Sequence, residues 1–454
     1  MPLRAPSRDV GLRSGVGGAA SARVERLGRR DAVVVRVDAT IAAGSLTPAD
    51  SDTLAEAARL ALRARLPLAG FLASGGASVD HGIEALHAWG GAARALAACS
   101  GVVPVVIAVE GPAVSGPALL LGLADVVVMT PESYAFVSGP AMVGQLTGVD
   151  IDAARLGGVE VHARRTGVAA LEAEDGQHAR QLVVELLDLL PDDADSEPPR
   201  RPSTDPPGRL CPELRAVIPD SATGSYDVRR VISSVLDRDH PFLELRGRWA
   251  MQVVTGLGRI SGRVVGIVAN QPQSMAGTLD ITASHKAARF VAFCDTFAVP
   301  IVTLVDTPGF LPGKDLEWRG MIRHGAQLVF AYADATVPRL CVVLRKAYGG
   351  AYIVMDSSTM GSDMCVAWPS AEVAVMGARG AVQILHRRAS PEEMTALEAD
   401  YNERYLTPWI AAERGLVADV IDPAHTRRVL ATALGTLHTK REQVVGRKHG
   451  NTPL

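Results

Sequence analysis

The chain has no surplus of basic residues and no long apolar run. Its 454 residues include 46 lysines and arginines against 49 aspartates and glutamates, a formal net charge of −3. Binding to nucleic acid needs a concentrated basic surface that neutralises phosphates, and this composition does not supply one. A transmembrane helix needs about 20 consecutive apolar residues, and no such run occurs. We therefore expect no nucleic-acid partner and no membrane partner.

Cysteine is scarce, and the few cysteines lie far apart. They are Cys99, Cys211, Cys294, Cys341 and Cys365. No C-x-x-C pair is present that could begin a zinc ribbon or a redox turn. Without such ligand spacing we expect no metal site. A reducing cytoplasm is the simplest setting for unpaired thiols.

Several common catalytic motifs are also missing. The sequence contains no G-x-S-x-G nucleophile elbow, no H-E-x-x-H helix and no G-x-x-x-x-G-K-[ST] phosphate loop. These absences exclude the usual α/β-hydrolase, zincin and P-loop chemistries. What remains is catalysis by backbone dipoles, with a cofactor supplying the reactivity.

What is present indicates a two-domain α/β protein. Apolar residues make up 48 % of the chain, and apolar runs such as AVVVRV and VVGIVAN alternate with Ala- and Leu-rich helical stretches. The proline-rich, charged stretch from Asp188 to Pro207 separates the two halves. We predict a flexible leader over residues 1–30, one domain over 31–190, a linker over 191–212 and a second domain over 213–454.

The two halves repeat each other at matched spacing. Gly44 lies 23 residues before Pro67, and Gly277 lies 23 residues before Pro300. Nine residues after each of these prolines comes another glycine, in SGG or in TPG. Two further glycines, in SGP and YGG, each follow a later proline by 12 residues. Chance agreement at so many positions is improbable, so the spacing predicts a duplicated domain.

Each half contains an apolar strand that ends in a turn of small residues and then starts a helix. The two segments read VVIAVEGPAVSGPALL and CVVLRKAYGGAYIVM. Such a turn points unpaired backbone N–H groups outward, and glycine lets a ligand oxygen come close. A single turn of this kind more often serves tight packing. Two equivalent turns in a duplicated domain favour a site for an anion or a developing enolate.

The second half strongly resembles the carboxyltransferase β subunits of propionyl-CoA and acetyl-CoA carboxylases. The motifs that carry the resemblance, in chain order, are GIVANQP (266–272), AGTLD (276–280), KAARFVAFCD (286–295), DTPGFLPG (306–313), IRHGAQL (322–328), ATVP (335–338), RKAYGGAY (345–352) and AWPSAEVAVMGARGAV (367–382). A match this long and ordered is highly specific. The first half is similar more loosely, through SGGA, GPAVSG, SGP, LTG, LGG and TGV in the family's order.

The resemblance implies two tandem crotonase-like domains of the ββα-superhelix type. The N-terminal domain would hold a CoA thioester, and the C-terminal domain would hold carboxybiotin. In the family the two sites meet across a dimer interface. The biotin ureido anion takes the α-proton, and the enolate attacks released CO2, so no side-chain base is required. A homo-oligomer, most simply a dimer-based hexamer, is implied.

The reaction implied is the carboxylation of acetyl-CoA or propionyl-CoA to malonyl-CoA or methylmalonyl-CoA. The chain has no A-M-K-M biotinylation motif, so biotin must come on a biotin carboxylase or carrier-protein partner. Two alternatives stay open. The same fold serves biotin-dependent decarboxylases that act on malonyl-type thioesters, and it could also serve as a non-catalytic assembly partner of an active paralogue.

The resemblance also assigns roles to particular residues. The catalytic N–H groups would be those of Ser115 and Gly116 toward the thioester enolate and those of Gly350 and Ala351 toward the ureido oxygen. The acyl-CoA side would be lined by Ser74, Gly75, Gly76, Ala113 and Ile353. The biotin side would be lined by Thr307, Pro308, Gly309, Gly349 and Tyr352. Ile353 stands where propionyl-type members commonly carry an aspartate, and isoleucine there matches members that also accept acetyl-CoA.

The first half departs from the family at its thioester side. The usual D-S-G-G-A-R-I-Q-E-G is replaced by ASGGASVDHG, so the acid at Ala73 and the arginine at Ser78 are missing. The usual G-P-C-A-G-G is replaced by GPAVSG, in which Ser115 takes the place of the first paired glycine. These changes predict either an unusual acyl-CoA substrate, which we favour, or a weakened thioester site.

Overall fold

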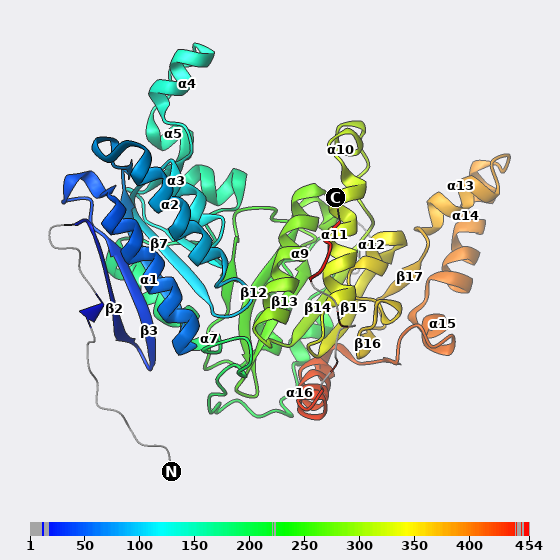
Figure 1. Ribbon diagram of the computed structural model, residues 1–454. Coiled ribbons are helices and arrows are strands. Elements are labelled where there is room, and N and C mark those ends of the chain that lie inside the picture. Colours follow the sequence, from blue (N-terminus) through cyan, green and yellow to red (C-terminus); the bar gives the residue numbers. More distant parts are fainter. Residues whose placement is uncertain are drawn as a thin grey trace. The chain divides into compact units, whose positions relative to one another are not determined.

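The computed structural model describes residues 11–12, 18–219, 221, 224–440, 442, 446 and 449–453. The chain divides into two compact units at Pro199 and Arg200, which lie inside the segment 191–212 that was predicted to be a linker. Each unit is a sheet covered by helices (Figure 1). The α/β architecture expected from the alternating apolar runs is confirmed.

The sheet of the first unit is parallel except at one edge. In spatial order its strands are β1 (Gly11–Leu12), β2 (Ala20–Leu27), β3 (Arg30–Val37), β5 (Leu68–Ser74), β7 (Val105–Val114), β8 (Val126–Met129) and β10 (Leu171–Glu172). Strands β1, β2 and β3 pair antiparallel, and each pair from β3 onward is parallel. A short strand, β9 (Tyr134–Phe136), pairs with the carboxyl end of β7. A separate small ladder joins β4 (Ser45–Leu46) to β6 (Gly76–Ala77).

The sheet of the second unit has the same strand order and the same directions. Its strands are β11 (Leu243–Leu245), β12 (Val253–Ile260), β13 (Arg263–Asn270), β14 (Ile301–Thr307), β15 (Arg339–Tyr348), β16 (Met364–Ala367) and β18 (Asp419–Val420). Strand β17 (Glu372–Ala374) pairs with the carboxyl end of β15, as β9 does with β7. The duplication predicted from glycine and proline spacing is confirmed.

In both units helices connect the successive parallel strands of the sheet. The first unit contains α1 (Pro48–Ala64), α2 (Gly82–Ala97), α3 (Gly116–Leu121), α4 (Pro140–Thr147), α5 (Ala153–Gly157), α6 (Val159–Val161) and α7 (Gly176–Leu189). The second contains α8 (Arg229–Val235), α9 (Ile281–Thr296), α10 (Lys314–Trp318), α11 (Met321–Asp334), α12 (Gly349–Val354), α13 (Ala378–Leu385), α14 (Pro391–Tyr401), α15 (Pro408–Glu413) and α16 (Thr426–Leu437). Helices α4 and α13 follow β9 and β17 and project from their own sheets (Figure 1). None of the helices in the described ranges is long and apolar enough to cross a membrane.

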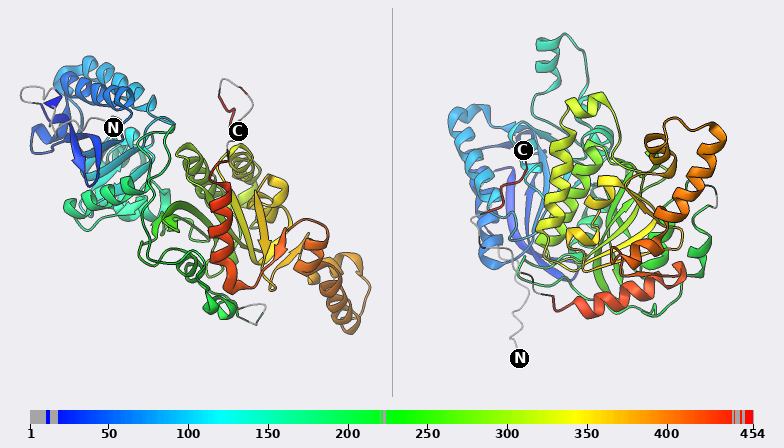
Figure 2. Two further views of the ribbon diagram at one scale, coloured as in Figure 1. Left: turned by 90° about the horizontal axis from the view of Figure 1, so that it is seen from below. Right: turned by 90° about the vertical axis from the view of Figure 1, so that its right-hand side faces the viewer.

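Local sequence explains how these helices begin and what they bury. The Thr47 side chain accepts the N–H of Asp50, and the Asp50 carboxylate accepts the N–H of Thr47, a capping box that starts α1. Small side chains then let α1 lie close to the sheet, and Ala57 and Ala61 are fully buried in the core of the first unit. On the second unit, Leu430 and the rest of the apolar face of α16 pack against the core beside β12 (Figure 2).

The expectation of a flexible leader over residues 1–30 is corrected for part of its length. Residues 20–27 of the predicted flexible leader form β2, which pairs along its whole length with β3. Its buried side chains are Ala20 and Ala22 on one face and Glu25 and Leu27 on the other, so both faces of the strand are partly covered. Residues 1–10 and 13–17 of the same predicted leader lie outside the described residues.

The linker has no helix or strand between 191 and 211, but it is packed. Asp205 is buried, and its carboxylate pairs with Arg209 at 2.6 Å and with Arg427 at 3.5 Å. The Arg427 guanidinium also reaches Asp237 at 2.7 Å, and neither of those two side chains is exposed. Buried ion pairs therefore fix a backbone that composition alone describes as loose.

Candidate functional site

A tight turn upstream of the strands is built in the same way in both units. Ala43 and Ala276 have φ of 53° and 54°, and the glycines that follow them, Gly44 and Gly277, have φ of 68° and 74°. A β-carbon on Gly44 would lie 2.1 Å from the carbonyl oxygen of Ala73, and one on Gly277 would lie 2.5 Å from that of Asp306. Only glycine allows this close approach, which presses each turn against the end of β5 or β14.

The turns predicted to line the two ligands follow directly after β5 and β14. The Ser74 hydroxyl donates to the carbonyl of Gly44 at 2.7 Å and accepts the N–H of Gly76 at 3.3 Å. In the second unit the Thr307 hydroxyl accepts the N–H of Gly309 at the same 3.3 Å. Strand pairing also places Ser74 opposite Ala113. The structure therefore brings the predicted Ser74, Gly75, Gly76 and Ala113 together in the first unit.

The same pairing operates in the second unit. Thr307 lies opposite Ala347, two residues before Gly349. The predicted residues Thr307, Pro308 and Gly309 thus stand beside the turn that contains Gly349, Gly350 and Ala351. Each unit holds one cluster of its own predicted site residues at the carboxyl ends of its parallel strands, which is where ligands bind in α/β sheets.

The first of the two strand-to-helix turns offers fewer free N–H groups than predicted. The N–H of Ser115 donates to the carbonyl of Phe136 at 2.9 Å, extending the β7–β9 ladder. That donor is therefore not available to a ligand, and the expectation that Ser115 contributes its N–H is corrected. The residue after Gly116 is Pro117, which has no N–H. Gly116 is the backbone donor left at this turn.

The second turn is more open. Gly350 and Ala351 are the second and third residues of α12, and N–H groups in the first turn of a helix have no carbonyl partner within the helix. A β-carbon on Gly350 would meet nothing nearer than the Phe310 ring, at 3.7 Å. Tyr352 is buried and Ile353 is 40 % exposed. Gly349 and Tyr352, predicted for the biotin side, and Ile353, predicted for the acyl-CoA side, thus lie on the same short helix of the second unit.

A buried ion pair that was not predicted from the sequence supports the second turn. The Arg345 Nε donates to the Asp306 carboxylate at 3.0 Å, and the other carboxylate oxygen accepts the backbone N–H of Lys346 at 3.1 Å. Burial raises the pKa of Asp306, and the Arg345 charge opposes that rise. Asp306, near the end of β14, is thereby bonded to Arg345 and Lys346 of β15, just before the turn at Gly349.

The first unit has no such pair at the matching places. Ala73 and Gly111 stand there instead, and a β-carbon on Gly111 would lie only 3.0 Å from the Ala73 methyl group. Ala73 and Gly111 therefore pack directly against each other, and a larger residue at position 111 would not fit. The family usually has an acid where this chain has Ala73, and Asp306 stands at the equivalent place in the second unit. A comparison of these two positions could have revealed the ion pair from the sequence.

Residues 18–452 match the family described as the carboxyl transferase domain. This chain belongs to the carboxyl transferase family. It is 41 % identical over 420 residues to the propionyl-CoA carboxylase beta chain of Roseobacter denitrificans, covering 92 % of this chain and 82 % of that one. It is also 41 % identical over 443 residues to the acetyl-/propionyl-coenzyme A carboxylase beta5 subunit of Mycobacterium tuberculosis, covering 94 % and 80 %.

A solved structure agrees with the family assignment. The transcarboxylase 12S subunit, described as a hexamer and determined with methylmalonyl-CoA and methylmalonic acid bound, superposes with a TM-score of 0.94. The match is at 40 % identity and covers 96 % of this chain and 85 % of that one. The prediction of two crotonase-like carboxyltransferase domains is confirmed.

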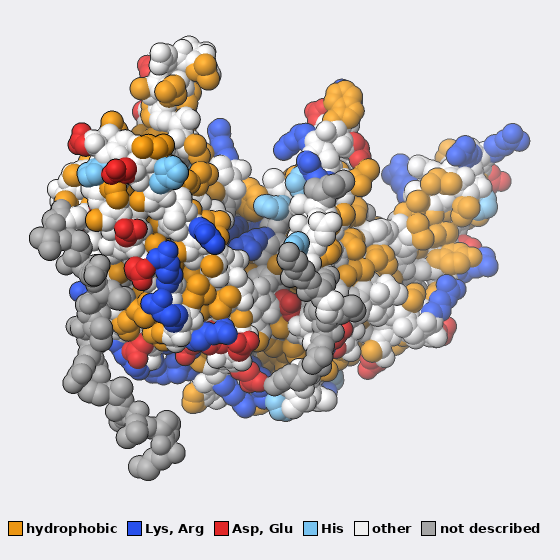
Figure 3. All heavy atoms as spheres, viewed as in Figure 1, with side chains coloured by type: hydrophobic (Ala, Val, Ile, Leu, Met, Phe, Trp, Pro, Cys, Tyr) orange, Lys and Arg blue, Asp and Glu red, His pale blue; other side chains and the backbone are white. Residues whose placement is uncertain are grey.

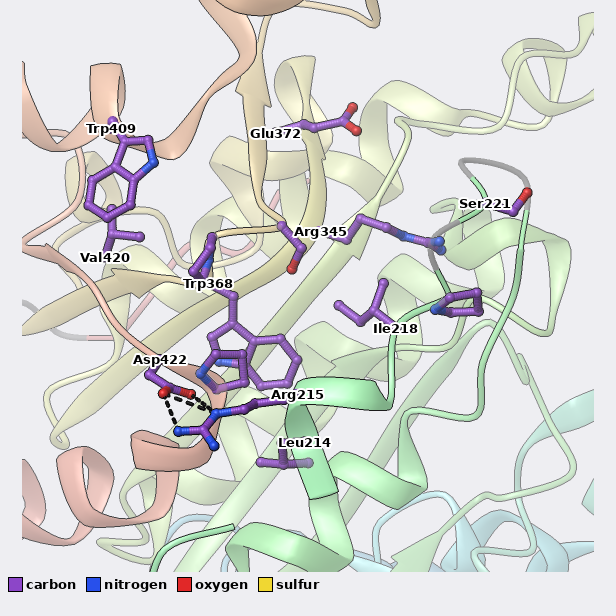
Figure 4. A pocket seen from close by; sticks show the side chains of 14 residues that line it. Leu214, Arg215, Ile218, Ser221, Arg345, Trp368, Glu372, Trp409, Val420 and Asp422 are labelled. Carbon is purple, nitrogen blue, oxygen red and sulfur yellow. Dashed lines mark hydrogen bonds and ion pairs between the residues drawn. The ribbon is translucent and has the colours of Figure 1, made fainter. Parts of the chain in front are cut away.

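A hollow of about 700 Å³ in this carboxyl transferase chain lies beside the second turn, not at it. Among the lining side chains, Arg345 belongs to the ion pair described above, and Arg215 pairs with Asp422 at 2.6 Å (Figure 4). None of the residues predicted for the acyl-CoA or biotin side lines this hollow. Arg345 therefore contacts both the Asp306 carboxylate behind the turn and this hollow.

One cluster of the described residues has the composition of a metal site. Side-chain ligand atoms of Asp237, Asp239 and His240 lie within 4.8 Å of one another. The carboxylates already have partners, because Asp237 accepts the N–H groups of Ser261 and Gly262 and pairs with Arg427. Asp239 accepts from Ser203 and Thr204, so the cluster takes part in the packing of the linker.

Ser115 holds a backbone conformation that favours glycine, with φ 61° and ψ −120°. We expect Ser115→Gly to raise the free energy of unfolding by about 1 kcal/mol, since relief of such strain is worth about 1–3 kcal/mol and added chain flexibility offsets part of it. Carboxyl transfer should be retained or raised, because the turn opens. Urea unfolding and a turnover assay check both expectations.

The matched control is Ser233→Gly, at an exposed helical position in α8. There the same change should lower stability by about 0.5–1 kcal/mol. Loss of carboxyl transfer in Ser115→Gly, with the fold intact, would contradict the expectation and would give the serine hydroxyl a role in the reaction.

Proposed function

We propose that this chain is the carboxyltransferase subunit of a biotin-dependent acyl-CoA carboxylase. It moves the carboxylate of carboxybiotin, presented on a biotin carboxylase or carrier-protein partner, to the α-carbon of acetyl-CoA or propionyl-CoA. The products are malonyl-CoA and methylmalonyl-CoA. The observation that supports this most is the pair of equivalent glycine turns, one on each of two duplicated units. The names of the relatives and the bound methylmalonyl-CoA of the transcarboxylase support the same substrate class.

The first turn stabilises the thioester enolate, and the second turn binds the ureido oxygen of biotin. The Gly116 N–H points at the thioester oxygen, which gains negative charge as the enolate forms. The N–H groups of Gly350 and Ala351 hold the ureido oxygen of biotin. Bound carboxybiotin supplies the carboxylate and, once it has been given up, the base. Loss of one such donor typically raises a barrier by about 3 kcal/mol, so these few N–H groups supply a large share of the catalysis.

The remaining predicted residues shape the two sides. Ser74, Gly75, Gly76, Ala113 and Ile353 line the acyl-CoA side, and Thr307, Pro308, Gly309, Gly349 and Tyr352 line the biotin side. The hydroxyls of Ser74 and Thr307 fix the turns through their contacts with Gly76 and Gly309. These side chains set the approach of the ligands, while the main chain carries the chemistry.

The decisive experiment reconstitutes the purified chain with a biotin carboxylase, a biotin carrier protein, ATP and labelled bicarbonate. Label should appear in malonyl-CoA and methylmalonyl-CoA when acetyl-CoA and propionyl-CoA are supplied. Carrier binding without label transfer to any acyl-CoA would favour a non-catalytic assembly partner. Transfer only from a malonyl-type thioester to biotin would favour a decarboxylase. The carboxylase names of the relatives make carboxylation our choice among the three.

The cytoplasm is the proposed location. All five cysteines are free thiols and all are buried. Unpaired thiols persist in reducing compartments, which is also where acyl-CoA thioesters and a carrier-bound biotin would be supplied.

We further propose a homo-oligomer, most simply a dimer-based hexamer. Large apolar side chains are exposed on the projecting helices, at 58 % for Met142 and 84 % for Leu146 on α4, and at 53 % for Ile384 and 64 % for Leu385 on α13. Figure 3 shows the apolar side chains gathered over α13 and β17. Exposed apolar patches of this kind mark contacts between chains.

Light scattering on the purified protein should give a mass near six times the 47.7 kDa of one chain. The same measurement on Leu385→Asp should show smaller species, because a buried charge without a partner opposes association. A stable monomer that retains full carboxyl transfer would contradict both the oligomer and a site shared between chains.

Acyl preference should depend on Ile353, which follows Tyr352 on α12. We expect acetyl-CoA to be accepted alongside propionyl-CoA, and Ile353→Asp to shift the ratio toward propionyl-CoA. A change of one methylene in an apolar pocket is worth about 1–3 kcal/mol of discrimination. The measurement is kcat/KM for acetyl-, propionyl- and butyryl-CoA in both proteins, with Ile353→Val as the control that keeps a branched apolar group. Acetyl-CoA that is inert with every variant would refute the inference.

A further inference from the structure

The side chain of Trp89 presents an unused hydrogen-bond donor beside the first turn. Trp89 lies on α2 and is half-buried. Its indole Nε1 is shielded from solvent and has no hydrogen-bond partner within the described residues. The indole N–H can only donate, and when buried it usually finds an acceptor. A donor left in this state is already desolvated and is available to an acceptor that arrives with a ligand.

The indole lies directly against Gly116. A β-carbon on Gly116 would stand 2.5 Å from Nε1, 2.6 Å from Cε2 and 2.8 Å from Cδ1 of Trp89, so the nitrogen is the nearest atom. These nearly equal distances place the face of the five-membered ring, at its nitrogen, against Gly116, so the N–H runs alongside the turn in the plane of the ring. Any residue larger than glycine at position 116 would displace it. The side-chain donor and the Gly116 N–H thus start from neighbouring points.

The turn has lost backbone donors that a second donor could replace. Ser115 gives its N–H to Phe136 at 2.9 Å, and Pro117 has none to give. The second unit shows no such shortage, because Gly350 and Ala351 both keep their N–H groups. There the nearest neighbour of a β-carbon on Gly350 is the Phe310 ring, which offers no donor. A side-chain donor is found at the turn where a backbone donor is missing.

We propose that the Trp89 indole N–H is a second donor to the thioester oxygen of the acyl-CoA, acting together with the Gly116 N–H. This inference rests on the proposed function and names a further catalytic residue for it. No proton is transferred to or from the indole. The N–H donates to the carbonyl oxygen in the bound thioester and donates more strongly as that oxygen becomes the enolate oxygen.

The test compares ligands that differ only in that oxygen. Propionyl-CoA and its thioether analogue S-propyl-CoA are titrated calorimetrically into the wild-type oligomer and into Trp89→Phe, without biotin. We expect Trp89→Phe to weaken binding of propionyl-CoA and to leave binding of S-propyl-CoA unchanged. In the complete reaction, kcat should fall about a hundredfold. Trp318→Phe, on α10 and 75 % exposed, is the matched control and should change neither quantity.

The phenyl ring leaves space that could disturb the packing, so a second replacement keeps the shape. Incorporation of 3-benzothienylalanine at position 89 exchanges the N–H for sulfur at nearly constant size. If this variant folds, turns over at the wild-type rate and still distinguishes thioester from thioether as the wild type does, the proposal is wrong. If the wild-type chain neither binds nor carboxylates any acyl-CoA, the proposed function fails, and the role of Trp89 fails with it.

Discussion

Gly350→Val is expected to reduce carboxyl transfer to less than about a tenth of the wild-type rate without unfolding the chain. The β-branched side chain would stand over the N–H groups of Gly350 and Ala351 and keep the ureido oxygen away from them. The position tolerates the added atoms, because its β-carbon would meet nothing closer than the Phe310 ring at 3.7 Å. Its φ is not in the left-handed region, so no backbone strain follows.

The measurement is the rate of label transfer from carboxybiotin to propionyl-CoA, together with a thermal melt of the same preparation. Gly435→Val on α16 is the matched control, since that glycine is exposed and has open space around it. It should leave the rate unchanged. A Gly350→Val protein that melts like the wild type and keeps more than a tenth of the activity would remove this turn from the mechanism.

The duplicated architecture could be predicted because it depends on contacts that only certain residues permit. Gly44 and Gly277 each sit where a β-carbon would collide with a strand-end carbonyl, so neither half can replace its glycine without moving the turn. A proline stands immediately before each of the equivalent strands β5, β7, β14 and β15, where no ladder N–H is needed. The spacing between such residues is retained when most other side chains change. The duplicated fold could therefore be predicted from it.

The errors in the site have a different origin. The N–H of Ser115 is taken by Phe136, a residue 21 positions further along the chain, through pairing of β7 with the short strand β9. Nothing in the local sequence GPAVSG indicates that partner. Trp89 could not be singled out for the same reason, because a lone tryptophan in a helical stretch reads as ordinary packing until its contact with Gly116 is known.

The leader and the linker were described from their amino-acid composition alone, which does not show whether a segment is packed. Strand β2 carries the exposed charges of Arg23 and Arg26, but the charged Glu25 of the same strand is buried, so residue type alone does not show which side chains are covered. In the linker, Asp205 and Arg209 look like solvent-exposed charges, yet they pair with each other in a buried position. Charge content measures polarity and does not reveal whether the charges have found partners.

Arg345→Met is expected to lower the free energy of unfolding of the second unit by about 3–5 kcal/mol, because it leaves the Asp306 carboxylate buried without its partner charge. The Asp306 side chain is 1 % exposed and that of Arg345 is 9 % exposed. Arg215→Met is the matched control in the same hollow. Arg215 pairs with Asp422 where both are substantially exposed, so its loss should cost less than about 1 kcal/mol.

The pH dependence separates a buried charge from lost packing. Burial already raises the pKa of Asp306, and Arg345 is the charge that opposes the rise. In Arg345→Met the folded-state pKa therefore lies further above that of the unfolded chain. A carboxyl of this kind favours the fold at low pH and loses that contribution as the pH rises through its folded-state pKa. The destabilisation should accordingly be smaller at about pH 5 than at about pH 8.

Denaturant unfolding at the two pH values, with the double variant Asp306→Ala/Arg345→Met as a third protein, measures the coupling directly. Ala73 and Gly111 show that the first unit folds without the pair. The double variant should therefore be more stable than Arg345→Met alone at the higher pH and should lose the pH dependence. Equal destabilisation by the single and double variants at both pH values would show that Arg345 acts through packing and its contact with the Gly224 carbonyl, and not through the charge on Asp306.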